Sequence, residues 1–378
     1  MARIDPFRME RMQSLYWHRV EHDLSESGVT PLSIAELLRL AGTEERASLL
    51  DAELGYPLSE GSEATRAAIA SWYPGATVAN VTLTNGGSEA NFLTLWTLLR
   101  PGKRLAFMVP NYLQGWGLGR HFADGTDVFS LKLREGRWGL DLAGLDRAVR
   151  PGRTSAIVVC NPNNPTGHVL TSQEMEAVVD AARRARAWIV ADEIYRGAEV
   201  EGDEGSPTFW GRYDKVIVTS GLSKAFAMPG LRLGWAVAPE DVVREIWVRH
   251  DYTTLTPGIL SDRLAGLAMQ PATRELVLAR TRKIIRANLP PLEEWIATHA
   301  GVFHYARPEA GAIAYVKYDL PIRSTALIDR IREEQSVLLV PGDMFGIGKG
   351  IRFGFGFDMA QTLKGLAKVD EVLAAVRR

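Results

Sequence analysis

The chain has 378 residues, of which 46% are hydrophobic, and its 44 Lys and Arg almost balance 45 Asp and Glu, for a formal net charge of −1. This length suits two domains, one of them large. The balanced charge argues against nucleic acid or an anionic membrane as a partner, and no apolar run approaches the ~18 residues that a membrane span needs.

The first half of the chain moves from isolated helices to an alternating pattern. Residues 1–45 predict a helix, then an irregular stretch at Ser25–Pro31, then a helix from Ile34. Farther along, short apolar runs alternate with helical patterns such as Ser172–Ala187. The predicted strands are Val81–Thr84, Arg104–Val109, Ala156–Cys160, Ala187–Ala191, Lys215–Thr219 and Leu233–Val237. This alternation indicates an α/β fold with a mostly parallel sheet covered on both faces.

The last third of the chain predicts a smaller domain. A long amphipathic stretch, Ser261–His299, is expected to leave the large domain. Strand and helix patterns then alternate again, at Ala312–Tyr318, Ser324–Glu334, Val337–Val340, Ile351–Gly356 and Leu363–Val376. We therefore expect a large domain over residues 46–265. A small α+β domain is expected from both chain ends, residues 1–45 and 266–378.

The cysteine and histidine content limits the possible chemistry. Cys160 is the only cysteine, so no disulfide can form within the chain, and a cytoplasmic location is expected. Its apolar neighbours predict a buried strand residue rather than a nucleophile. The seven histidines show no metal-binding spacing, so no metal site is predicted.

Two motifs follow predicted strands and offer groups that bind anions or ring oxygens. Asn85-Gly-Gly-Ser-Glu opens a helix, whose free N–H groups and dipole favour a phosphate beside Gly87 and Ser88. A simple tight turn is the competing interpretation. Asn161-Pro-Asn-Asn-Pro-Thr-Gly holds Asn164 on a backbone stiffened by prolines, where its amide can donate to an oxygen. The alternative for this heptad is a rigid turn.

Asp192-Glu-Ile-Tyr195 ends a predicted buried strand. A carboxylate buried there is costly unless it has a cationic or hydrogen-bonding partner. A protonated pyridine nitrogen is such a partner, and the pairing makes the ring an electron sink. Tyr195 could then reach a phenolic oxygen on the same ring. A structural Asp satisfied by protein groups is the alternative.

Lys224 lies in a run from Ser220 to Trp235 that also contains Arg232. A lysine amine can form a Schiff base with an aldehyde cofactor, and a guanidinium can grip the phosphate of that cofactor. Two surface cations on one loop are the alternative.

Arg352, within Ile351-Arg-Phe-Gly-Phe-Gly, predicts a carboxylate clamp or else an internal salt bridge.

These motifs together resemble the aspartate-aminotransferase superfamily, the fold-type I enzymes that use pyridoxal 5′-phosphate (PLP). The patterns N-P-x-N-P-T-G, D-E-x-Y, S-K-x-F-x-x-x-G-x-R and R-x-G-F-G occur in the family's order over roughly residues 45–360. The resemblance implies a mostly parallel seven-stranded sheet in the large domain. It also implies a homodimer with shared active sites.

The resemblance assigns a role to each motif. Lys224 would carry PLP as an aldimine and then shuttle the substrate proton, with Asp192 on the ring nitrogen and Asn164 and Tyr195 on the ring's phenolic oxygen. The remaining implied cofactor contacts are Gly87, Ser88 and Arg232 at the phosphate with Ser220 assisting, Tyr112 stacked on the ring, and Tyr56 reaching the partner subunit's phosphate. Arg352 would clamp the substrate α-carboxylate. For Tyr112, core packing is the competing interpretation.

Two departures from the family pattern bear on the substrate. Asp23-Leu-Ser-Glu-Ser-Gly-Val is more similar to capreomycidine-synthase-like enzymes, which act on hydroxylated arginine by elimination and ring closure. Glu26, beside Gly28, would then face a basic side chain, or else cap the turn. The arginine used by dicarboxylate-specific members is not found, since His250–Thr254 occupies that region.

We therefore expect a PLP-dependent aminotransferase acting on an L-amino acid and a 2-oxo acid. The alternative is a PLP-dependent lyase or cyclase that performs β-elimination on a substituted amino acid, including a basic one. We expect burial and Arg232 to lower the pKa of Lys224. A ligand sensor attached to a DNA-binding domain is disfavoured, because no helix-turn-helix segment precedes the fold.

Overall fold

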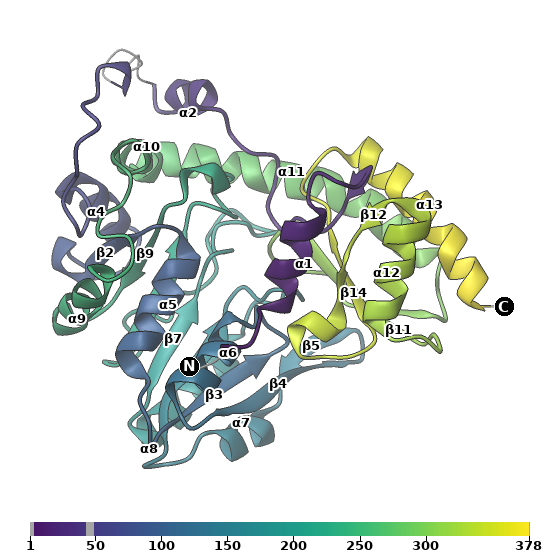
Figure 1. Ribbon diagram of the computed structural model, residues 1–378, viewed down its shortest axis with the longest axis horizontal. Coiled ribbons are helices and arrows are strands. Elements are labelled where there is room, and N and C mark those ends of the chain that lie inside the picture. Colours follow the sequence, from purple (N-terminus) through teal and green to yellow (C-terminus); the bar gives the residue numbers. More distant parts are fainter. Residues whose placement is uncertain (1–3, 43–48, 378) are drawn as a thin grey trace.

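A sheet of eight strands organises the larger part of the chain (Figure 1). The computed structural model describes residues 4–42 and 49–377. In spatial order the strands are β2 (Val81–Thr84), β9 (Gly234–Val237), β8 (Val216–Gly221), β7 (Trp188–Asp192), β6 (Thr154–Cys160), β3 (Arg104–Val109), β4 (Thr126–Arg134) and β5 (Arg137–Leu140). The neighbours from β8 to β4 pair in parallel, whereas β9 and β5 run antiparallel to theirs.

Helices cover both faces of this sheet, because successive strand residues point to opposite sides. Leu105 and Phe107 face one cluster, and Ala106 and Met108 face the main core. On the first face lie α5 (Gly87–Leu98), α6 (Gln114–Phe122) and α9 (Glu240–His250). On the other lie α4 (Glu63–Ala70), α7 (Leu142–Ala148), α8 (Ser172–Ala185) and α10 (Ile259–Met269). The covered parallel sheet confirms the predicted α/β class.

A second, antiparallel sheet is built from the C-terminal part of the chain. Its strands, in spatial order, are β10 (Phe303–Tyr305), β11 (Ile313–Tyr318), β14 (Gly350–Gly354) and β13 (Val340–Pro341). The helices packed with it include α12 (Ser324–Gln335), α13 (Met359–Arg377) and the long α11 (Pro271–Ala297). The predicted domain boundary at residue 45/46 lies outside the described residues, and the division into domains stays a prediction.

The N-terminal segment lies against this second sheet. After α1 (Arg8–Tyr16), β1 (His22–Asp23) pairs in parallel with β12 (Val337–Leu338), and α2 (Ile34–Leu40) follows. A side chain at Gly354 or Gly356 would place its Cβ 1.8 Å from the carbonyl oxygen of Glu26 or 2.0 Å from that of Gly28. The Phe-Gly-Phe-Gly run therefore lets residues 24–28 approach β14 closely, and this segment becomes one wall of the site described below.

The structure differs from the predicted elements in two places. The sheet has eight strands instead of seven, because β4 folds back into the hairpin strand β5. Neither strand was predicted from the sequence, since Thr126–Arg134 alternates polar and apolar residues instead of forming a continuous apolar run. The predicted amphipathic stretch Ser261–His299 forms two helices, α10 and α11, that break at Gln270-Pro271. None of the described helices is long and apolar enough to cross a bilayer.

Candidate active site

The sequence motifs meet where the parallel strands β6, β7 and β8 end. Asn164 follows β6, Asp192 ends β7, and Ser220 and Lys224 lie at and just after the end of β8. Since the carboxyl ends of parallel strands share one edge of a sheet, side chains from segments far apart in the sequence converge there. The N-terminal end of α5 reaches the same edge, where Gly87 lies against Ser220.

Lys224 forms an ion pair with Glu26. Its Nζ lies 2.7 Å from Glu26 Oε1, and 24% of the lysine side chain is exposed. Burial lowers the pKa of Lys224, but the charges of Glu26 and Tyr195 outweigh it, so the pKa is raised. The expectation of a lowered pKa is therefore wrong for this structure, because the nearest charge is a carboxylate and not Arg232.

Glu26 caps the turn, which is one of the two roles weighed from the sequence, and it also pairs with Lys224. Its contact with a basic substrate side chain stays a prediction. Burial opposes its ionisation, but Lys224 and the backbone N–H of Ser27 lower the pKa of Glu26 to about 2. Its Oε1 also accepts from the backbone N–H groups of Ser27 and Gly28, at 2.8 and 3.0 Å, so the side chain holds the turn. A Cβ on Gly28 would lie 3.4 Å from the carbonyl oxygen of Ser223. Glu26 and Gly28 therefore both contact the loop that carries Ser223 and Lys224.

Asp192 is held by hydrogen bonds and has no cationic partner among the described residues. Its Oδ2 accepts from Asn91 Nδ2 at 2.8 Å, and its Oδ1 accepts from the backbone N–H of Ile194 at 3.1 Å. Thr219 Oγ1 in turn donates to Asn91 Oδ1 at 2.6 Å. Burial raises the pKa of Asp192, and these donors only partly oppose the rise. The carboxylate is thus oriented but lacks a counter-charge.

Arg352 presents the opposite case, a buried cation that Glu26, Glu10 and Asp23 influence only from a distance, without a direct ion pair. It is 1% exposed, and no Asp or Glu of the described chain forms a salt bridge with it. Its Nη1 donates to Asn164 Oδ1 at 3.1 Å, its Nη2 donates to the carbonyl of Ser25, and its Nε has no partner. Burial lowers the pKa of Arg352. The internal salt bridge weighed from the sequence is absent from the described residues.

Tyr195 lies among the same groups and is 2% exposed. Burial raises the pKa of its phenol, while the charges of Lys224 and Arg352 and a hydrogen bond with Ser27 lower it. The structure therefore brings Tyr195, Lys224, Asn164 and Arg352 into one site. Their individual roles toward a cofactor stay predictions.

The predicted phosphate contacts surround the first turn of α5. The guanidinium of Arg232 occupies the space beside Gly86, where a Cβ would lie 2.6 Å from its Nη2. A Cβ on Gly234 would lie 2.4 Å from the Gly87 backbone nitrogen. Ser88 is exposed, and its hydroxyl accepts from Gln114 Nε2 at 3.0 Å. These small residues and the guanidinium suit an anion at a helix N-terminus.

The two predicted tyrosine contacts differ in their positions. Tyr112 packs edge-on against Phe7 at 4.7 Å, and its hydroxyl donates to Glu10 Oε1 at 2.9 Å. The packing interpretation therefore holds for this ring, and its stacking on a cofactor stays a prediction. Tyr56 is 86% exposed and reaches no part of the site within one chain. Its predicted contact with a partner subunit remains a prediction.

Sequence reasoning missed Asn91 and Glu10. Asn91 lies four residues after Gly87, so it shares a helix face with the phosphate-binding turn, and that spacing could have identified it. No sequence pattern marks Glu10, because its contact with Tyr112 joins segments 102 residues apart. Cys160 is buried as predicted, and the described residues contain no cluster of His, Cys, Asp or Glu suited to a metal ion.

These observations fit PLP. Asp192 is a buried anion that lacks a cation, as a protonated ring nitrogen would supply. Arg232 and the glycines at the first turn of α5 would suit its phosphate, and Lys224 lies on a loop at the same edge of the sheet. The orphaned Nε of Arg352 leaves a donor free for a carboxylate.

Comparisons with known proteins agree with this geometry. The family model of class I and II aminotransferases matches residues 29–369. The chain is 31% identical to capreomycidine synthase of Streptomyces vinaceus, over 96% of this chain and 92% of that protein. It is 30% identical to an aspartate/prephenate aminotransferase of Thermus thermophilus, over 77% of this chain and 74% of the other.

A solved structure agrees as well. A PLP-dependent aminotransferase from Streptococcus suis superimposes with a TM-score of 0.90 at 30% identity, over 99% of both chains. The match covers the two sheets and all the motifs described above. The chain belongs to the class I and II aminotransferase family of PLP-dependent enzymes.

Proposed function

We propose that this enzyme transfers the amino group of an L-amino acid to a 2-oxo acid, with Lys224 as the proton-transfer group. One observation carries the proposal: the site holds two buried charges of opposite sign, Asp192 and Arg352, and neither forms a direct ion pair within the described chain. Unpaired buried charges destabilise a fold, so such a pair is best explained by ligands that complete it. A cationic ring nitrogen and an amino-acid carboxylate are the complementary groups.

The residues that would hold PLP are those already placed around α5 and the ends of the strands. Arg232 and the backbone N–H groups at Gly87 and Ser88 would bind its phosphate, with Ser220 adjacent. Asp192 would face the ring nitrogen, Asn164 and Tyr195 the phenolic oxygen, and Tyr112 the ring face. When bound, PLP supplies an aldehyde for the amine and a ring that withdraws electrons from the substrate Cα.

Lys224 and Glu26 form the proton-handling part of the site. In the structure the ion pair keeps the Lys224 amine charged, because Glu26 stays ionised down to about pH 2. To act as a base, the amine must give up that proton and turn away from Glu26. Glu26 then retains a negative charge that can accept a hydrogen bond from a cationic group of the substrate.

Arg352 would bind the substrate α-carboxylate. Its guanidinium is held by Asn164 and by the carbonyl of Ser25, so its direction is set before a substrate arrives. Preorganised donors lose little freedom on binding, which favours a defined orientation of the Cα–H bond toward Lys224. The free Nε adds a further donor on the same plane.

Elimination with ring closure is the second candidate function. It is favoured by the carboxylate of Glu26 beside Lys224, which suits a basic substrate side chain, and by the 31% identity to capreomycidine synthase. The groups that bind the cofactor serve both reactions. The outcome therefore depends on whether the substrate carries a β-substituent that can leave.

The test is a panel of amino acids, each followed by two readouts. Transamination converts the cofactor to its amine form, visible by absorbance, without release of ammonia. Elimination releases ammonia with no 2-oxo acid acceptor present. Accumulation of the amine form with common L-amino acids supports the proposal, whereas ammonia or a cyclic product from basic amino acids alone assigns the second candidate.

We also propose a homodimer. The segment around Tyr56 exposes Leu50, Leu54 and Leu58 by 62–79%, and Tyr252 in the loop after α9 is 79% exposed. Exposed apolar residues concentrated in this way are typical of a subunit interface. Sedimentation of the purified protein at twice the mass of 41.7 kDa supports the dimer, and a monomer that turns over at the full rate contradicts shared sites.

We also propose a cytoplasmic location, because Cys160 is a free thiol. It is a buried free thiol whose pKa is raised by burial, as suits a structural residue in a reducing compartment. Fractionation of the source cells, with the protein followed by its cofactor absorbance, tests this location.

A further inference from the structure

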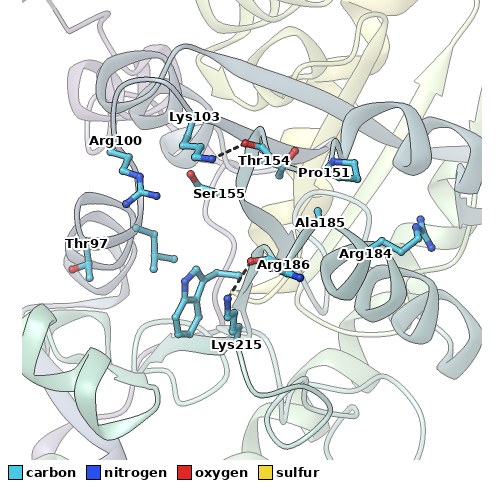
Figure 2. A pocket seen from close by; sticks show the side chains of 13 residues that line it. Thr97, Arg100, Lys103, Pro151, Thr154, Ser155, Arg184, Ala185, Arg186 and Lys215 are labelled. Atoms are coloured by element: carbon cyan, nitrogen blue, oxygen red, sulfur yellow. Dashed lines mark hydrogen bonds between the residues drawn. The ribbon is translucent and has the colours of Figure 1, made fainter.

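A basic cavity lies at the opposite edge of the large sheet from the candidate active site. Its volume is about 590 Å³ (Figure 2). Its lining contains five cationic side chains and, among the described residues, no Asp or Glu. The residues that line it include Arg100, Lys103, Ser155, Arg186, Trp188 and Lys215. Since the whole chain has a formal net charge of −1, this concentration of cations is local.

The topology of the sheet assembles these cations. Strands β8, β7, β6 and β3 are neighbours and run in parallel, so all four begin at one edge. Lys103 and Lys215 directly precede β3 and β8, and Arg186 lies two residues before β7. Segments more than a hundred residues apart therefore bring positive charge to the same place. The active-site residues follow the other ends of these strands, about 15–20 Å away for strands of this length.

The two lysines are anchored but not neutralised. Lys103 Nζ donates to the carbonyl of Gly152 at 2.6 Å, and Lys215 Nζ donates to the carbonyl of Arg186 at 3.3 Å. Neither lysine forms a salt bridge with a described carboxylate. Lys215 also lies 6.0 Å from the centre of the Trp188 ring. Each ammonium keeps donors free after its carbonyl contact, because a lysine carries three.

The positions of the three arginines in the lining have explanations that need no ligand. Arg184 is paired with Asp146 at 2.5 Å and points away from the lysines in Figure 2. Arg100 and Arg186 are exposed and follow the C-terminal ends of α5 and α8, where cations stabilise the helix dipole. This ordinary explanation does not cover Lys103 and Lys215, which are half-buried and precede strands.

We propose that this cavity binds a small polyanion with adjacent phosphate groups, held between Lys103 and Lys215 at a site separate from the PLP site. Two anchored ammonium groups on either side of a cavity suit the paired charges of a diphosphate. Arg100 and Arg186 at the rim add long-range attraction. Ser155 and Trp188 add a hydroxyl and an indole to the lining.

The test uses the PLP-saturated protein and inorganic pyrophosphate in isothermal titration calorimetry at low ionic strength. We expect one site per chain. Lys103→Gln and Lys215→Gln should each weaken the affinity at least tenfold, and the double variant more. Lys283→Gln removes the same charge from an exposed position on α11, away from the cavity, and should leave the affinity unchanged. Melting temperatures of all variants confirm that they fold.

Three results would overturn the proposal. The first is no saturable binding up to about 10 mM pyrophosphate. The second is an equal loss of affinity in Lys283→Gln, which would indicate general attraction. The third is a change in the cofactor absorbance on titration, which would place the pyrophosphate at the PLP phosphate seat. A parallel titration with ADP distinguishes a nucleotide ligand from a free diphosphate. Tighter binding of ADP than of pyrophosphate indicates that the site recognises a nucleotide, and equal binding indicates that it recognises the phosphates alone.

Discussion

Buried charge is arranged in opposite ways in the candidate active site and in the cluster around His168. In the active site, neither Asp192 nor Arg352 forms an ion pair with a described residue. At His168, which is 7% exposed, Nδ1 lies 2.7 Å from Glu309 Oε2 and Nε2 lies 3.2 Å from Glu174 Oε2. The active site leaves two buried charges without an ion pair, whereas His168 is paired with one largely buried carboxylate and one half-exposed carboxylate.

The His168 cluster links the two sheets. His168 follows the Asn161–Gly167 turn, Glu174 lies in α8, and Glu309 lies in the loop between β10 and β11. Glu174 also accepts from the backbone N–H of Leu140 and Thr171. Burial lowers the pKa of His168, but its bonds to both glutamates outweigh this and raise it to about 9. A fully satisfied cluster of this kind stabilises the fold, whereas an incomplete one awaits a partner.

Substitutions in the first region should therefore affect turnover, and substitutions in the second should affect stability. The largest expected effect is that of Lys224→Ala, which should lower kcat by about 10⁴-fold or more, because attachment and proton transfer are both lost. The unfolding free energy should also fall, because Glu26 would be left without its ion-pair partner. Lys364→Ala, at an exposed position on α13, is the control. Full turnover by Lys224→Ala would remove this lysine from the mechanism.

Asp192→Asn should lower kcat by about 10²–10³-fold, since a preorganised charge at a developing electron sink contributes about 3–4 kcal/mol. Stability should hold or rise, because the variant removes a buried charge that lacks a cation. Steady-state kinetics and denaturant unfolding measure the two effects. A loss of stability together with unchanged kcat would show that Asp192 serves the fold.

Arg352→Gln should raise the KM for the amino acid about 10- to 100-fold, the range for one or two charged hydrogen bonds. The effect on kcat should be smaller. An amine lacking the α-carboxylate should react equally well with both proteins, which provides a control within the same assay. An unchanged KM for the amino acid would argue against carboxylate binding at Arg352.

His168→Gln tests the second region through its pH dependence. Because the folded pKa of about 9 exceeds the unfolded value of about 6.5, the histidine contributes its full stabilisation below pH 6.5 and loses it as pH rises toward 9. The difference in unfolding free energy between wild type and variant should be on the order of 3 kcal/mol at pH 6 and fall sharply by pH 9. A pH-independent difference would contradict the charged cluster, and turnover should be retained.

Asn91→Leu should have the smallest effect, about fivefold in kcat, the value of one net hydrogen bond of about 1 kcal/mol. Losing the Asn91 donor raises the pKa of Asp192 further, which should shift the pH titration of the cofactor absorbance. Thr219→Val removes only the hydroxyl that holds Asn91, so it should shift the titration in the same direction but less. Unshifted titrations in both variants would show that Asn91 does not position Asp192.

The sequence predicted the strands that carry the motifs more closely than the rest of the sheet. Val81–Thr84 and Arg104–Val109 match β2 and β3 to the residue, because both are buried runs that end at turn residues, Asn85-Gly86 and Pro110-Asn111. Strands β4 and β5 were not predicted, because one side of a hairpin at the sheet edge faces water. Polar and apolar residues therefore alternate along it instead of forming a continuous apolar run. Two helices were merged over Ser261–His299, since the amphipathic pattern continues across Gln270-Pro271.

The motifs by themselves determined which chemical groups the site contains. Each motif follows a strand, so the sequence alone places its functional side chain at the end of that strand. Packing alone decided which of those groups meet. Lys224 and Glu26 are 198 residues apart and Asn91 and Asp192 are 101 apart, so local periodicity carries no information about either contact. The pKa of Lys224 was mispredicted for this reason. The folded chain pairs this lysine with a carboxylate from the N-terminal segment, which reaches the site only because Gly354 and Gly356 let that segment lie against β14.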